Sequence, residues 1–141
     1  MQYTTEQINQ IAENIERGKI CYFNPETTEI ETISNKKESI EDELYLDVQR
    51  RVSKWKSMIR IDPLRSFESF EIMEDFIRER IPEGILNNRL CSALSSRNPY
   101  QNFEEIIKSS HYNFEWSMFK SNKIKDRIIE LLKIENYQVN Y

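Results

Sequence analysis

Apolar residues recur every three or four positions along most of the chain, which is the spacing of one buried helical face. The first such stretch follows Thr4 and Thr5, either of which can cap a helix. It stops at Gly18, because a left-handed residue ends a helix at low cost. The positions expected to face inward are Ile8, Ile11, Ala12 and Ile15. The pattern therefore predicts an N-terminal helix.

Strand-like patterns follow this helix. Residues 20–23 are rich in strand formers, and residues 29–33 continue with partial alternation of apolar and polar positions. Asn24 and Pro25 lie between them, and this pair is typical of a turn, since Asn can bond its own backbone and Pro fixes φ. A third alternating stretch covers residues 58–61. We expect a short antiparallel sheet of two or three strands.

The helical spacing returns in five further stretches. Ser39 is the expected cap of the first, which runs to about Trp55, and Ser66 is the expected cap of the second. The third follows Pro82, the fourth is short, and the fifth extends from Tyr112 to Ile134. Their inward positions are, in order, Ile40, Leu44, Val48 and Val52; Phe67, Phe70, Met73, Phe76 and Ile77; Ile85, Leu86, Leu90, Ala93 and Leu94; Phe103, Ile106 and Ile107; and Trp116, Phe119, Ile124, Ile128, Leu131 and Leu132.

About six helices beside a short sheet predict an α+β fold that is mostly helical. A chain of 141 residues is expected to form a single domain, 1–141, and the patternless residues 135–141 are a candidate disordered tail. No apolar run is long enough to span a membrane, and the polar N-terminus lacks the features of a secretory signal. Two cysteines in such a chain are typical of reduced thiols, so we expect a small soluble cytoplasmic protein.

The charge is unevenly divided along the chain. Residues 1–49 carry 11 acidic and 4 basic side chains, whereas residues 50–141 carry 13 and 16, and the formal net charge is -4. Either the two parts attract each other in the fold, or the later part presents a basic face to an anionic partner. Intramolecular pairing is the favoured interpretation because it requires no partner.

The scarcity of three residue types excludes several classes of site. The chain has two glycines, Gly18 and Gly84, one histidine, His111, and two cysteines, Cys21 and Cys91. Phosphate-binding loops need clustered glycines, and a structural zinc site needs four Cys or His ligands. We therefore expect no cofactor and no metal, and we lean against an enzyme. A thiol–imidazole pair could form only between His111 and one of the two cysteines. The favoured interpretation of Cys91 is a buried, small hydrophobic residue and not a catalytic thiol.

A basic stretch is the first candidate site. Arg50, Arg51, Lys54 and Arg60 lie close together in the sequence with Trp55 among them, a combination that can hold phosphates and stack a base. A second basic cluster lies at residues 120–127. The alternative is that these bases pair with the acidic first third of the chain, and the sequence pI near 5.2 also argues against a dedicated nucleic-acid binder.

A carboxylate cluster is the second candidate site. Glu71 and Asp75 are four residues apart and share a helical face, and Glu74 lies beside them. Such a group can hold Mg²⁺ or serve as acid and base. The favoured alternative is the solvated face of an amphipathic helix.

Several motifs occur in an order that resembles a bacterial group, uncharacterised protein family 0158. They are Cys21 to Thr27, Ile59 to Asp62, Phe70 to Ile77, Arg89 to Leu94, Phe103 to Ile107 and Trp116 to Phe119. The resemblance implies a single domain in a bacterial cytosol and carries no activity. It also implies glycines in two loops that lack them here. Thr28 takes the glycine's place in the first, and residues 95–102 replace a glycine-containing, arginine-rich loop in the second.

These patterns favour a non-catalytic module that acts by binding another protein. The first alternative is nucleic-acid or phosphate binding through residues 50–60. The second is a carboxylate-dependent enzyme that uses Glu71, Glu74 or Asp75.

Overall fold

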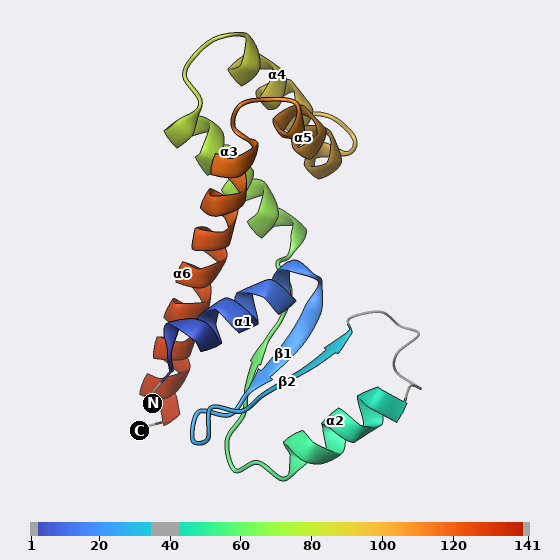
Figure 1. Cartoon of the computed structure of the whole chain (residues 1–141), viewed down its shortest axis with the longest axis vertical. Coiled ribbons are helices and arrows are strands. Elements are labelled where there is room, and N and C mark those ends of the chain that lie inside the picture. The colour runs from blue at the N-terminus through green and yellow to red at the C-terminus, as the bar shows by residue number, and fades with distance from the viewer. Residues whose placement is uncertain (1–2, 35–42, 140–141) are drawn as a thin grey trace. The chain divides into compact units, whose positions relative to one another are not determined.

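The computed structural model describes residues 3–34 and 43–139, with side chains to residue 135. Over these residues the chain forms six helices and a three-stranded antiparallel sheet, as predicted (Figure 1). The elements are α1 (Thr5–Glu16), β1 (Lys19–Phe23), β2 (Ile30–Ser34), α2 (Glu43–Ser53), β3 (Ile59–Ile61), α3 (Ser66–Arg80), α4 (Ile85–Leu94), α5 (Pro99–Lys108) and α6 (Asn113–Val139). The predicted cap Ser39 and the inward position Ile40 lie outside the described residues.

The chain divides into two compact units. Unit 1 comprises residues 1–64 and 124–141, and unit 2 comprises residues 65–123, so α6 contributes residues to both. The expectation of one domain stays a prediction. So does the disordered tail, although α6 continues past Ile134 to Val139.

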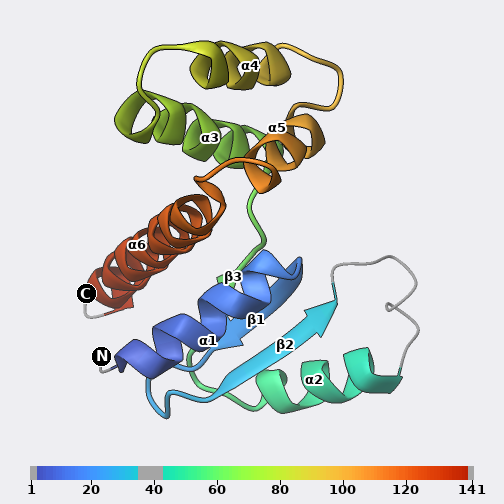
Figure 2. The same cartoon turned by 45° about the horizontal axis from the view of Figure 1, so that its top comes forward.

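Unit 1 is built on the sheet, whose strand order is β2-β1-β3. Strand β1 is central, so its side chains are buried on both faces. One face carries Ile20, Tyr22 and Ile33, which form a core with Val48 and Val52 of α2. The alternate residues of β1 face α1 (Figure 2). Helix α1 begins with the predicted cap at Thr4 and ends before the left-handed Gly18.

The turn between β1 and β2 is organised by Asn24, which is only 3% exposed. Its Oδ1 accepts hydrogen bonds from the backbone N–H groups of Glu26 and Thr27 at 2.9 and 3.3 Å. Thr28, where the resemblance implies glycine, adopts a left-handed backbone with φ 65°. The Asn24 motif therefore has a structural role in closing the hairpin.

Unit 2 is a helical unit with an aromatic core. Phe76 of α3 packs edge-to-face against Trp116 and Phe119 of α6, with ring centroids 5.2 Å apart in each pair. Phe103 of α5 makes the same kind of contact with Trp116 at 4.8 Å. These rings tie three helices together.

Several predictions about single positions are wrong. Ser66 is the first residue of α3 rather than its cap; the cap is Arg65, whose N–H donates to Glu68. Helix α2 ends at Ser53, before Trp55. Four residues expected to be buried are exposed: Leu44, Phe67, Ile85 and Cys91. Leu44, Phe67 and Ile85 each lie in the first described turn of a helix, whereas the buried residues of those helices lie in later turns. Cys91 lies on the open side of α4.

Candidate functional site

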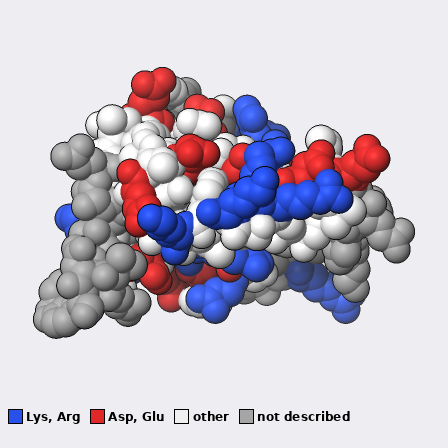
Figure 3. Space-filling model, turned by 90° about the horizontal axis from the view of Figure 1, so that it is seen from below, with Lys and Arg blue, Asp and Glu red and all other residues white. Residues whose placement is uncertain are grey.

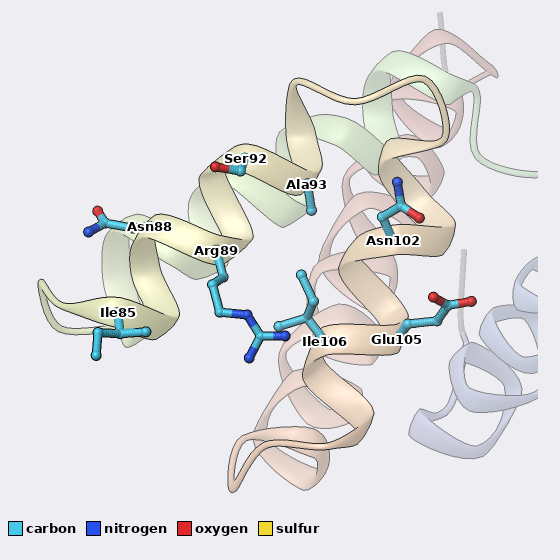
Figure 4. Close-up of a pocket in the computed structure, with 8 residues that line it drawn as sticks. All are labelled: Ile85, Asn88, Arg89, Ser92, Ala93, Asn102, Glu105 and Ile106. Atoms are coloured by element: carbon cyan, nitrogen blue, oxygen red, sulfur yellow. The ribbon is translucent and has the colours of Figure 1, made fainter.

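Helices α4 and α5 border an open groove within unit 2. Its volume is about 560 Å³, and both helices contribute to its walls (Figure 4). The lining residues are Ile85, Asn88, Arg89, Ser92 and Ala93 of α4 and Asn102, Glu105 and Ile106 of α5. On each helix these positions recur at intervals of about three or four residues, so each wall is one helical stripe. The groove combines an apolar centre with a polar rim.

Short-range hydrogen bonds fix the two helices that form this groove. The side-chain amide of Asn87 donates to the carbonyl of Ile81 at 3.0 Å, which anchors the first turn of α4. Asn102 donates to the hydroxyl of Ser96 at 2.7 Å across the connection between the helices. Pro99 begins α5, a position where its missing N–H has no helical partner to lose. The loop around Arg97 thus closes without glycine.

Arg89 is the only basic residue of the groove. Its guanidinium extends from α4 towards Ile106 of α5, whereas the Glu105 carboxylate lies on the other side of Ile106 and points away from it (Figure 4). Among the described residues Arg89 forms no salt bridge. Ile85, at the end of the groove, is 81% exposed. An unpaired cation and an exposed aliphatic side chain therefore share one open surface.

A polar cluster joins α5 to α6 within unit 2. The Lys120 ammonium donates to the hydroxyl of Tyr100 at 3.1 Å and to Glu104 at 3.3 Å, and the indole N–H of Trp116 donates to Glu104 at 3.1 Å. Burial alone would lower the pKa of Lys120, but the hydrogen bond and charge of Tyr100, helped by Glu104, raise it above the ordinary lysine value. Lys120 therefore stays protonated, and the cluster stabilises helix packing.

The arginines of the predicted basic stretch all have acidic partners. Arg51 forms two hydrogen bonds to Glu31 of β2, at 2.7 and 2.9 Å. Arg50 pairs with Asp47 at 3.2 Å, and Arg60 pairs with Asp62 at 2.8 Å. The hydrogen bond to Glu31 raises the pKa of Arg51 further above its already high value. The Arg51–Glu31 pair is the intramolecular compensation that the charge division suggested.

Lys54 and Trp55, the other two residues of this candidate site, do not extend it into a continuous positive surface. Trp55 is half-buried and packs against the core of α2 and the sheet, whereas Lys54 is exposed. On the side that contains α2, basic and acidic side chains are interspersed (Figure 3). A nucleic-acid contact there would compete with ion pairs already formed.

The three carboxylates of the second candidate site lie on α3. Glu71 and Glu74 are exposed, while Asp75 pairs with Arg78 and lies 4.0 Å from the Lys123 ammonium. None of the three lines the α4–α5 groove. Among the described residues no three His, Cys, Asp or Glu side chains form a group that could hold a metal ion.

The structure separates the thiols from the histidine. Cys21 is fully buried in unit 1, and burial raises the pKa of its thiol to about 12. Cys91 is exposed on α4 and donates to the side-chain oxygen of Asn87 at 3.4 Å. Exposed His111 shares no hydrogen bond with either cysteine in the described part of the chain. The geometry brings no thiol–imidazole pair together.

Comparison with known proteins assigns the chain to a family. The model of Uncharacterised protein family (UPF0158) matches residues 16–141. The chain belongs to UPF0158. The region matched to UPF0158 contains the sheet, both predicted sites and the α4–α5 groove. No curated protein and no solved structure matched the chain. No described helix is both long and apolar enough to cross a membrane.

Sequence reasoning missed the groove. Arg89 lies within the region matched to UPF0158, and it interrupts an otherwise apolar stripe between Leu86 and Leu90. That interruption is the one signal in the sequence. Its meaning depends on how α4 and α5 pack, because a groove is the space that two neighbouring stripes leave unfilled.

Proposed function

We propose that this chain is a non-catalytic protein-binding module and that the α4–α5 groove receives the partner. The observation that carries the proposal is the unpaired Arg89 guanidinium in an open groove whose centre is Ile106 and Ala93. Binding sites of this type combine apolar contact with a few polar groups that set orientation.

The shape of the groove suits recognition of a helix or a short segment. Its α4 wall runs from Ile85 to Ala93, which is about 12 Å along a helix. A partner with an aliphatic side chain over Ile106 and a carboxylate beside Arg89 would satisfy both the apolar and the charged group.

We infer that the protein works in a bacterial cytosol. Two observations support this setting. The free thiols of Cys21 and Cys91 suit a reducing compartment, and the resemblance to the family implies a bacterial source.

The two alternatives have weaker support. Nucleic-acid or phosphate binding through Arg50, Arg51 and Arg60 would require each to leave an acidic partner. A carboxylate-dependent enzyme would need Glu71 and Glu74, which are exposed on a helix face, to gather around a substrate.

Site-specific photocrosslinking in cells tests the proposed function. A photoreactive phenylalanine derivative replaces Ile85 in the groove, and the control places it at Glu74, an exposed position on α3 in the same unit. We expect a discrete adduct from the groove position alone. The captured protein, once purified, should bind the chain at least tenfold more weakly when Arg89→Glu is introduced. Identical adducts from both positions, or an affinity unchanged by Arg89→Glu, would contradict the proposal.

A further inference from the structure

We propose that the occupant of the α4–α5 groove is a second copy of this chain, bound through an isologous two-fold interface. The inference rests on the proposed function, because it names the partner of the same groove. The order of charged and apolar groups across the groove favours this partner.

The order across the groove is cation, apolar residue, anion. The Arg89 guanidinium lies on one side of Ile106, and the Glu105 carboxylate lies on the other side (Figure 4). A two-fold axis through the centre of such a surface exchanges its two sides. Arg89 of each copy then faces Glu105 of the other, and Ile106 meets Ile106. In an isologous interface this reciprocity is required, since residue i contacts j and j contacts i.

Both charged groups are available for such a pairing. Among the described residues neither Arg89 nor Glu105 forms a salt bridge, whereas Arg50, Arg51, Arg60, Arg65 and Arg78 all do. The Glu105 carboxylate accepts one long hydrogen bond of 3.4 Å, from the neutral side chain of Gln101. A groove that carries both signs of charge unpaired matches its own inverted copy better than a uniformly acidic or basic ligand.

Apolar contact would accompany the charge pairing. Ile85 is 81% exposed at one end of the groove, and the small side chain of Ala93 leaves room beside Ile106. In a two-fold interface Ile85 of each copy would pack against the other copy, so two exposed aliphatic side chains would be removed from water.

Analytical ultracentrifugation of the purified full chain tests the inference. We expect a concentration-dependent monomer–dimer equilibrium with a Kd between about 1 µM and 1 mM, as for small interfaces. Arg89→Glu alone and Glu105→Arg alone each place like charges opposite each other, so each should weaken the dimer at least tenfold.

Mixing these two variants gives the sharpest result. In a mixed dimer Glu at position 89 of one copy faces Arg at position 105 of the other, and the second contact keeps Arg89 opposite Glu105. An equimolar mixture should therefore dimerise at least tenfold more tightly than either variant alone, which also shows that both variants are folded. The double variant Arg89→Glu/Glu105→Arg should recover dimerisation as well. The matched controls, Arg97→Glu and Glu74→Arg, change the same charges outside the groove and should leave the equilibrium unchanged.

Two outcomes would overturn the inference. One is a monomer throughout the concentration range, and the other is a dimer that the groove charges do not affect. If the groove position at Ile85 nevertheless crosslinks to a different protein whose binding depends on Arg89, the proposed function stands while the second copy is excluded as its partner. If neither experiment detects an Arg89-dependent contact, both proposals fail.

Discussion

Thr28 holds a backbone conformation that suits glycine. Its φ of 65° lies in the left-handed region, which costs an L-residue roughly 1–2 kcal/mol, and a β-branched side chain is especially rare there. Glycine removes this strain but has a more flexible unfolded chain, which offsets roughly 0.5–1 kcal/mol. We expect Thr28→Gly to raise the free energy of unfolding by about 0.5–1 kcal/mol, measured by urea denaturation.

The neighbouring residue provides the control for this prediction. Thr27 is not among the described residues with positive φ, and its hydroxyl accepts a hydrogen bond from the N–H of Glu29. Thr27→Gly should therefore lower the stability. A stability gain from both substitutions, or from neither, would show that strain at Thr28 is not the cause.

Cys21 makes stability depend on alkaline pH. Its folded pKa of about 12 exceeds the unfolded value of 9.0, so the folded chain keeps a proton that the unfolded chain releases. The stabilisation is complete below pH 9 and is lost as the pH rises towards 12, by roughly 1.4 kcal/mol per pH unit within that window. Urea unfolding at several pH values should show a smaller slope for Cys21→Ala than for the natural chain.

Cys91→Ser serves as the comparison, because it removes the other cysteine, whose side chain is exposed. We expect the alkaline slope to be smaller in Cys21→Ala than in Cys91→Ser. A slope that Cys21→Ala leaves unchanged would mean that other groups cause the whole alkaline loss.

Prediction of single residues from sequence succeeded where periodicity and burial coincide. Ile8, Ile11 and Ile15 are buried as expected because α1 packs along β1 and this stripe is its buried face. Phe67 and Ile85 were predicted equally well by spacing and are nevertheless exposed. Spacing identifies a helical stripe, but only the tertiary structure decides how much of that stripe is covered.

At the scale of elements, Glu104 joins α5 to α6 through two donors. Replacing it by alanine leaves the Trp116 indole N–H without its partner and leaves Lys120 with Tyr100 alone. Partly buried donors that lose a charged acceptor cost more than surface contacts, so Glu104→Ala should lower the free energy of unfolding by about 2 kcal/mol. Glu74→Ala, on the exposed face of α3, should change it by less than about 0.5 kcal/mol. Equal effects in urea denaturation would exclude a stabilising role for the cluster.

Elements were more predictable than their connections. The helices and strands follow from local patterns, and the hairpin register follows from the turn at Asn24. The partners Arg51 and Glu31 are twenty positions apart, and no local pattern indicates that α2 places one beside the other. The α4–α5 groove has the same origin, because its Arg89 and Glu105 come from separate helices.

At the scale of the molecule, α6 runs without interruption from Asn113 to Val139 and contributes to both units. If one unit unfolded alone, this helix would have to end near Lys123. If unit 1 unfolded, the buried residues Ile124, Ile128 and Leu132 would lose the core around them. If unit 2 unfolded, the same residues would lose the helical turns of α6 that precede them. We therefore expect cooperative unfolding, in agreement with the single domain predicted from chain length.

The two tryptophans make this expectation measurable, because Trp55 belongs to unit 1 and Trp116 to unit 2. In a Trp55→Phe variant, fluorescence reports unit 2 while far-UV circular dichroism reports the whole chain. Their urea transitions should coincide. Adding Ile11→Ala, a cavity in the core of unit 1, should lower the stability by about 2–5 kcal/mol by both probes. If the fluorescence midpoint stays fixed while the dichroism transition moves or splits, the units unfold separately, and residues 65–123 form a domain of their own.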